Sequence, residues 1–199
     1  MSARTETSND IASESANAID LVNEDNSTTK QHTHIGQAIS GSNINWEAQS
    51  PIKLIAHIID NFHEKHRMQF QQLIQLTKAV KLKNTDHCDY PHHLESHLSQ
   101  MKYELEEHMM KEEAILFPMI MKGYYPSGPI SVMEAEHLEH EKALEKLTTL
   151  TNKFTPPHDA DEDWQRLYAK IHELYNDLNE HIHLENNILF YARLRQKGQ

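Results

Sequence analysis

The 199-residue chain is poor in cysteine, in glycine and in long apolar runs. Cys88 is the only cysteine, which excludes a disulfide framework. Five glycines leave few sites for tight turns and favour a mostly helical chain. No apolar run reaches the roughly 20 residues that a membrane-spanning helix needs, and the N-terminal segment lacks the apolar core of a secretory signal. We therefore expect a cytoplasmic protein with no membrane partner.

Positive charge is also scarce. The chain has 19 Lys and Arg residues against 30 Asp and Glu residues, so its formal net charge is -11. An acidic surface repels phosphate backbones, which argues against nucleic acid as a partner. Histidine, with 16 residues, is the compositional outlier.

The composition and periodicity of the sequence change near Trp46. Residues 1–45 are rich in Ser, Thr, Asn, Asp, Glu and Ala and show little periodicity, so we expect a flexible leader. Apolar residues then recur at helical spacing, and no stretch alternates with period two. Residues 46–199 therefore predict an all-α domain, an up-down-up-down four-helix bundle. The expected helices cover residues 51–84, 92–121, 131–154 and 161–195.

One pattern of polar and apolar residues occurs twice. "HMMKEEAILF" (residues 108–117) and "HIHLENNILF" (residues 181–190) both have His, then Glu four residues later, then Ile-Leu-Phe. Residues four apart share one helix face, so the two side chains of each His–Glu pair point in one direction and can bind one metal centre. Offset seven returns to that face, and we expect Ile115 and Ile188 to cover the polar pairs with apolar bulk.

The two polar pairs are expected to meet inside the bundle. At about 1.5 Å per residue, the heights of His63, His108 and His181 agree within about one helical turn. His137 fits less well, because it lies close to the expected start of the third helix. The convergent set is His63, His108, Glu112, His137, His181 and Glu185.

This ligand set indicates a two-metal centre. Four imidazoles and two carboxylates are too many ligands for one structural zinc, but they suit two borderline metals with the carboxylates bridging them. Iron is favoured, and manganese is the alternative. Buried Glu and His side chains otherwise cost several kcal/mol unless they are paired.

Glu104 and Glu136 are candidates for supporting the chemistry. Glu104 lies one turn before His108 on the same face, and Glu136 precedes His137. Either carboxylate could orient a ligating imidazole or line a path for protons or iron. A solvated helix face explains both residues equally well.

Other motifs give no competing site. "HEKH" is one residue short of H-E-x-x-H, and "DADED" lacks the Gly and Glu of an EF-hand loop. The carboxylates of Asp86 and Asp89 make Cys88 a poor nucleophile. The other histidines are interpreted as surface or hydrogen-bonded residues: His32, His34, His57, His66, His87, His92, His93, His97, His140, His158, His172 and His183.

The segments "HMMKEEAILFPMI", "GPISVMEAEH", "TPPHD" and "HIHLENNILF" closely resemble the iron–sulfur cluster repair di-iron proteins, the hemerythrin-like family called repair of iron centres. The resemblance covers roughly residues 45 to 195. It implies that the family's iron ligands fall on the same six residues. It also implies two iron ions in a non-haem centre with oxo and carboxylate bridges. The implied role is repair of iron–sulfur clusters damaged by oxidative or nitrosative stress. The implied partners are damaged iron–sulfur proteins, with NO, O2 or peroxide as small ligands.

Two features depart from the related families. Members of the repair family typically begin with a small domain carrying a Cys-Cys pair, whereas this chain has only the polar leader. Oxygen-carrying hemerythrins place a second His four residues after the one on the third helix, where this chain has Glu141. That change argues against simple oxygen carriage, and we expect Glu141 to lie beside the centre or in solvent.

Three functions remain open at this point. The first is cluster repair, by iron release or by NO removal. The second is an oxygen or NO sensor or store. The third is an enzyme that reduces NO at the di-iron centre. A homodimer is also left open.

Overall fold

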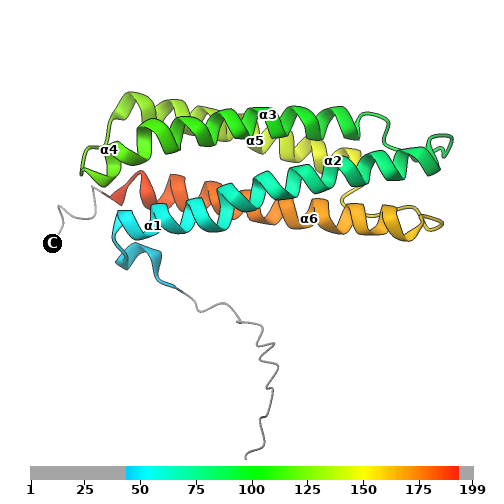
Figure 1. Cartoon of the computed structure of the whole chain (residues 1–199), viewed down its shortest axis with the longest axis horizontal. Coiled ribbons are helices and arrows are strands. Elements are labelled where there is room, and N and C mark those ends of the chain that lie inside the picture. The colour runs from blue at the N-terminus through cyan, green and yellow to red at the C-terminus, as the bar shows by residue number, and fades with distance from the viewer. Residues whose placement is uncertain (1–43, 193–199) are drawn as a thin grey trace, which may run out of the picture. The chain divides into compact units, whose positions relative to one another are not determined.

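The computed structural model describes residues 44–192 (Figure 1). The expected leader falls almost wholly on residues 1–43, which lie outside the described range. Within that range the structure contains helices and connectors and no strand, which confirms the all-α class. A short 3₁₀ turn, η1 (Trp46–Ala48), precedes the bundle.

Four helical rods lie side by side, which confirms the four-helix bundle (Figure 1). The first rod is α1 (Pro51–Ile58), η2 (Ile59–His63) and α2 (Glu64–Asn84); the second is α3 (Leu94–Lys111), η3 (Glu112–Leu116) and α4 (Phe117–Met121); the third is α5 (Ser127–Leu150); the fourth is α6 (Glu162–His183) and η4 (Leu184–Leu189). α2 packs against α3 and α6, and α3 also packs against α5.

Side-chain caps explain where two of the rods begin. The Ser50 hydroxyl accepts a hydrogen bond from the Lys53 backbone N–H at 3.4 Å, and Pro51 occupies the first helical position. A carboxylate oxygen of Asp161 accepts from the Trp164 N–H at 2.9 Å. Both starts agree with the sequence prediction.

The third helix is displaced from its predicted bounds. It starts at Ser127 rather than Ser131, because Pro129 falls in the first turn, where backbone N–H groups have no intrahelical partner. It ends at Leu150 rather than Phe154, which has a φ of 59° and cannot continue a right-handed helix. The earlier start places His137 deeper in the helix and removes most of the height mismatch.

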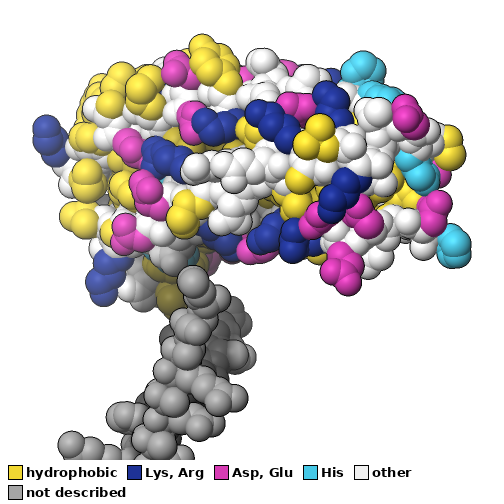
Figure 2. Space-filling view, turned by 45° about the vertical axis from the view of Figure 1, so that its right-hand side comes forward, with side chains coloured by type: hydrophobic (Ala, Val, Ile, Leu, Met, Phe, Trp, Pro, Cys, Tyr) yellow, Lys and Arg dark blue, Asp and Glu magenta, His cyan; other side chains and the backbone are white. Residues whose placement is uncertain are grey.

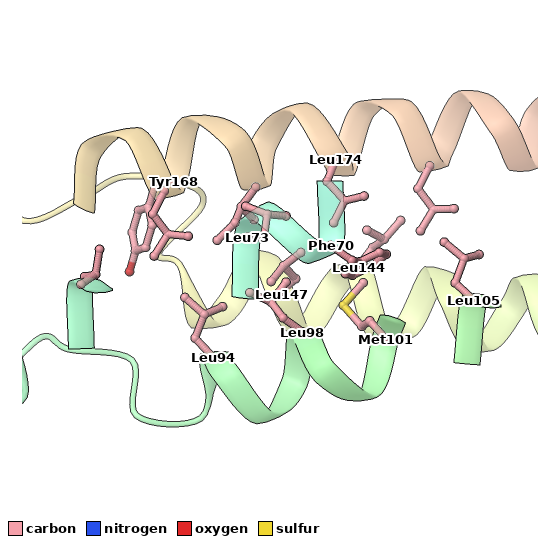
Figure 3. Close-up of a cluster of buried hydrophobic side chains, with 14 of the residues drawn as sticks. Phe70, Leu73, Leu94, Leu98, Met101, Leu105, Leu144, Leu147, Tyr168 and Leu174 are labelled. Atoms are coloured by element: carbon pink, nitrogen blue, oxygen red, sulfur yellow. The ribbon is translucent and has the colours of Figure 1, made fainter. Parts of the chain in front are cut away.

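The apolar core forms two clusters. The larger includes Phe70, Leu98, Leu144 and Leu174, whose side chains point between the rods in Figure 3. The smaller cluster takes most of its residues from α1, α4 and η4. Along every rod, the predicted polar residues lie at or close to the point where the two clusters meet. Burying one such side chain contributes about 1.5–3 kcal/mol, so the polar layer lies between two strongly stabilised regions.

Charged side chains of both signs are spread over the face shown in Figure 2. Hydrophobic side chains gather toward one end in the same view. Among the described helices, none combines the length and the apolar character that crossing a membrane requires. Cys88 is exposed and free.

Candidate metal centre

The six predicted ligands come together from all four rods. Each side chain is at most 1% exposed, which is unusual for four histidines and two glutamates. They fall into two groups, and in each group the candidate ligand atoms lie within 4.8 Å of one another. The groups are His63, Glu112, His181 and Glu185, and His108, Glu112, His137 and Glu185.

Both carboxylates belong to both groups. Oε2 of Glu112 lies 3.5 Å from His63 Nε2 and 3.4 Å from His108 Nε2. Glu185 lies 3.1 Å from His137 Nε2 through Oε2, and 3.2 Å from His181 Nε2 through Oε1. Each glutamate therefore touches one imidazole from each group, which is the arrangement of a bridging carboxylate.

The polar atoms of this layer do not satisfy one another. Neither oxygen of Glu112 or of Glu185 accepts a well-formed hydrogen bond within the described residues. The Nε2 atoms of His63 and His181 lie 3.2 Å apart, and those of His108 and His137 lie 3.0 Å apart. Such crowding of buried acceptors costs several kcal/mol without a partner of opposite charge. The donor set therefore fits cations.

Burial and mutual charge shift the pKa values of the groups. Burial lowers the pKa of His63 to about 4 and that of His108 to about 3, so both imidazoles are neutral near pH 7, the form that binds metals. Burial, helped by the charge of Glu185, raises the pKa of Glu112 well above its ordinary value. Burial also opposes ionisation of Glu185, but the neighbouring histidines outweigh it and lower that pKa.

Three of the four histidines are oriented through their outer nitrogen. His63 Nδ1 lies 2.7 Å from a carboxylate oxygen of Glu113, and His108 Nδ1 lies 2.9 Å from one of Glu136. His137 Nδ1 lies 2.8 Å from Oδ1 of Asn186. Because each oxygen accepts the Nδ1 proton, the Nε2 lone pair is left for a metal.

Glu113 and Asn186 were not predicted as site residues, although the sequence carries a signal for both. Each residue directly follows the Glu of one repeat. Each then reaches a histidine on a different rod from its own. Glu113 is held in turn by Arg67, at 2.7 Å.

Three rods contain a π-helical turn at the polar layer. η2 ends at His63, η3 begins at Glu112, and η4 contains Glu185. In both repeats, the backbone N–H of the Phe donates to the carbonyl of the Glu five residues earlier. Such turns add a residue to a helix and often occur at functional sites.

The π-helical turns overturn the prediction for the isoleucines. Ile115 is 55% exposed, and Ile188 is only partly buried. The extra residue rotates the chain, so that Leu116 and Leu189 face the core instead.

The phenylalanines of the two repeats cover the centre. Phe117 stacks on His63 with ring centroids 5.6 Å apart, and Phe190 stacks on His137 at 6.0 Å. Both are at most 5% exposed. They supply the apolar cover that was predicted for Ile115 and Ile188.

Glu104 and Glu136 border a cavity of about 370 Å³. Glu136 joins this cavity to the centre, because it contacts His108 and also lies 2.5 Å from Lys111 Nζ. Glu104 is partly exposed and accepts a hydrogen bond from Gln100 at 2.6 Å. Glu141 is exposed and belongs to neither ligand group.

His66 and His140 lie close to the centre, although both were predicted to be surface or hydrogen-bonded residues. His66 is fully buried and its Nδ1 lies 3.0 Å from Gln69 Oε1, so it is hydrogen-bonded but not on the surface. His140 is 5% exposed and borders the cavity. Nε2 of each is buried without a hydrogen-bond partner. Their i+3 spacing from a predicted ligand was the available signal.

Residues 54–192 match the family model of the hemerythrin HHE cation binding domain. This chain belongs to the hemerythrin HHE family. The family match and the buried His/Glu groups agree with metal binding by this HHE domain.

Relatives of this HHE protein carry descriptions that concern cluster repair. The iron-sulfur cluster repair protein YtfE of Musicola paradisiaca is 46% identical over 153 residues, which cover 76% of this chain and 69% of the relative. YtfE of Pectobacterium atrosepticum is 45% identical over 152 residues, covering 75% and 69%. A probable iron-sulfur cluster repair protein of Haemophilus influenzae is 46% identical over 154 residues, covering 76% and 69%. The resemblance inferred from the motifs is thus confirmed.

Proposed function

We propose that this protein binds two iron ions and acts in the repair of iron–sulfur clusters damaged by oxidative or nitrosative stress. The observation that carries the proposal is the pair of buried ligand groups that share Glu112 and Glu185. The descriptions of the relatives support the repair role. The proposed partners are damaged iron–sulfur proteins of the cytoplasm, with NO, O2 or peroxide as small ligands.

The donor chemistry favours iron. Each of the two ligand groups offers two imidazole nitrogens and oxygens from two shared carboxylates. Such a set suits borderline divalent metals better than calcium or magnesium. Bound iron supplies open coordination positions and redox chemistry. The protein's own part is to fix the imidazole tautomers through Glu113, Glu136 and Asn186. Phe117 and Phe190 exclude water from two faces of the site.

The cavity beside Glu136 is the proposed route to the centre. Its lining includes four carboxylates, which attract cations. Glu136 contacts the outer nitrogen of His108, so a proton or a cation that reaches Glu136 is one side chain away from the ligand groups. Glu104 is proposed to extend this path toward solvent, without touching a ligand.

Metal content and the optical spectrum test the first part of the proposal. We expect two irons per chain and near-ultraviolet absorption from a bridged diferric centre in the wild type. The Glu112→Ala and Glu185→Ala variants are expected to lose both irons, because each removes an oxygen shared by the two positions. Glu141→Ala is the matched control and is expected to keep both. Two irons in either shared-glutamate variant would refute the ligand set.

Reactivation of a damaged iron–sulfur enzyme tests the repair role. We expect the iron-loaded protein to restore activity and the Glu185→Ala variant to fail. Turnover of NO by the reduced protein, compared with the iron-free form, separates an NO-reducing enzyme from a repair protein. Stoichiometric binding of NO or O2 with no reactivation would instead favour a sensor or store.

A further inference from the structure

His66 is a buried histidine beside the metal centre that belongs to neither ligand group. It lies one helical turn after His63, and its ring centroid is 5.3 Å from that of His181. Its side chain is fully buried, and its Nε2 has no hydrogen-bond partner in the described structure. A buried imidazole with a bare nitrogen needs an explanation, because an apolar residue would fill the same space without an unsatisfied acceptor.

A chain of hydrogen bonds fixes the tautomer of His66. Lys65 Nζ and Gln69 Nε2 each lie 2.6 Å from Oδ2 of Asp177. A carboxylate only accepts, so the amide nitrogen of Gln69 faces Asp177 and its oxygen faces His66. At 3.0 Å, that oxygen accepts the Nδ1 proton. Nε2 of His66 is therefore left as a lone pair.

The predicted ligands His63, His108 and His137 have the same arrangement. In each, Nδ1 contacts a side-chain oxygen and Nε2 lies in the buried polar layer. Metal-binding histidines generally donate their second ring N–H to such an acceptor. A histidine that only fills space requires no relay of this kind.

We propose that His66 is a seventh protein ligand, supplying a third imidazole to the metal position held by His63 and His181. Nε2 of His66 lies outside the compact group of atoms within 4.8 Å, so the proposal includes an inward movement of the ring when metal binds. The two positions are then unequal. This inference rests on the proposed two-metal site.

The test is a Co²⁺ titration of the full chain, followed by visible absorption. His66→Leu is expected to weaken one of the two binding steps by about tenfold or more and to change the cobalt spectrum, while the other step stays within about twofold. Gln69→Leu, which leaves His66 in place but removes its acceptor, is expected to weaken the same step by a smaller factor. His172→Leu is the exposed histidine control and is expected to match the wild type.

The outcomes separate this inference from the proposed function. If the wild type fails to bind two ions, the two-metal function itself fails. If it binds two, and His66→Leu and Gln69→Leu both show wild-type affinities and spectra, only the role of His66 is refuted. Thermal unfolding of the metal-free variants supplies a second readout. His66→Leu is expected to unfold at or above the wild-type temperature, and if it does not fold, the Gln69→Leu titration decides alone.

Discussion

The ring of Phe117 stacks on the ring of His63, with an interplanar angle of 24°. The equivalent Phe190 stacks on His137 with an angle of 5°. Each repeat thus contributes a glutamate shared by both groups, an acceptor for a histidine of another rod, and an aromatic cover for the same histidine. That combination explains why the chain contains the His–Glu and Ile-Leu-Phe pattern twice.

Replacing Phe117, which stacks on His63, tests which side chains the π-helical turn directs into the core. Phe117→Ala is expected to lower the free energy of unfolding by about 3–5 kcal/mol, because it leaves a cavity in the core. Ile115→Ala, two residues earlier, is expected to cost less than about 0.5 kcal/mol because Ile115 is on the surface. Urea unfolding of the metal-free protein measures both. Similar losses of unfolding free energy in the two variants would contradict the placement of Phe117 in the core and Ile115 on the surface.

Removing an outer hydrogen-bond acceptor tests the orientation of the ligands. Glu113→Ala is expected to weaken metal binding about 10- to 100-fold, because His63 loses the oxygen that fixes its tautomer. Glu141→Ala carries the same change of charge near the centre without contacting a ligand. Co²⁺ titration of the two variants makes the comparison. Equal weakening in both would indicate that only long-range charge matters.

Acid is expected to destabilise the metal-free protein. His63 and His108 have pKa values of about 4 and 3 in the folded state, against 6.5 for an exposed histidine. Below pH 6.5 the unfolded chain therefore binds more protons than the folded one. The stabilisation is complete above pH 6.5 and is lost progressively as the pH falls toward 4. Urea unfolding at stepped pH values measures the slope.

His66 and His140 contribute to the same fall of the unfolding free energy with decreasing pH. Burial lowers the pKa of each to about 3, so each adds to the uptake of protons on unfolding. A His66→Leu/His140→Leu double variant is expected to show a shallower decline between pH 6.5 and 4. A decline as steep as that of the wild type would show that these two rings do not stay neutral in the folded protein.

The cavity predicts an effect on metal exchange. Glu104 borders the cavity without contacting a ligand, so Glu104→Ala is expected to slow iron removal by a chelator several-fold at unchanged stoichiometry. Glu145→Ala, which changes an exposed glutamate of α5 that does not line the cavity, is the control. Stopped-flow chelation of the reduced protein gives the rates. Identical rates for the wild type and both variants would exclude the cavity as a route.

Much of this architecture could be read from the sequence, because its signals are local. Apolar periodicity predicted the rods, and the repeated His–Glu spacing together with the heights along the helices predicted which residues converge. The start of α5 was misplaced because Pro129 is compatible with a first helical turn as well as with a break. The buried state of His66 and His140 depends on packing between rods, which spacing along one helix does not specify.

The π-helical turns could not be predicted in this way. Helical periodicity assumes i→i+4 hydrogen bonds, so an added residue changes which side chains face inward without changing composition or spacing. Ile115 was therefore assigned to the core and Phe117 was not assigned to the centre. Glu113 and Asn186 were missed for a related reason, since their partners lie on other rods.

The π-helical turn between Glu112 and Phe117 also makes the length of this segment critical. Deleting one residue there would allow regular α-helical hydrogen bonding, which is intrinsically the more favourable form. It would also turn every later side chain of the rod by about 100° and move Phe117 away from His63. The segment is thus expected to accept exchanges of side chain at the exposed Ala114 and Ile115. It is expected to reject insertions or deletions, an intolerance normally associated with the middle of a coiled coil.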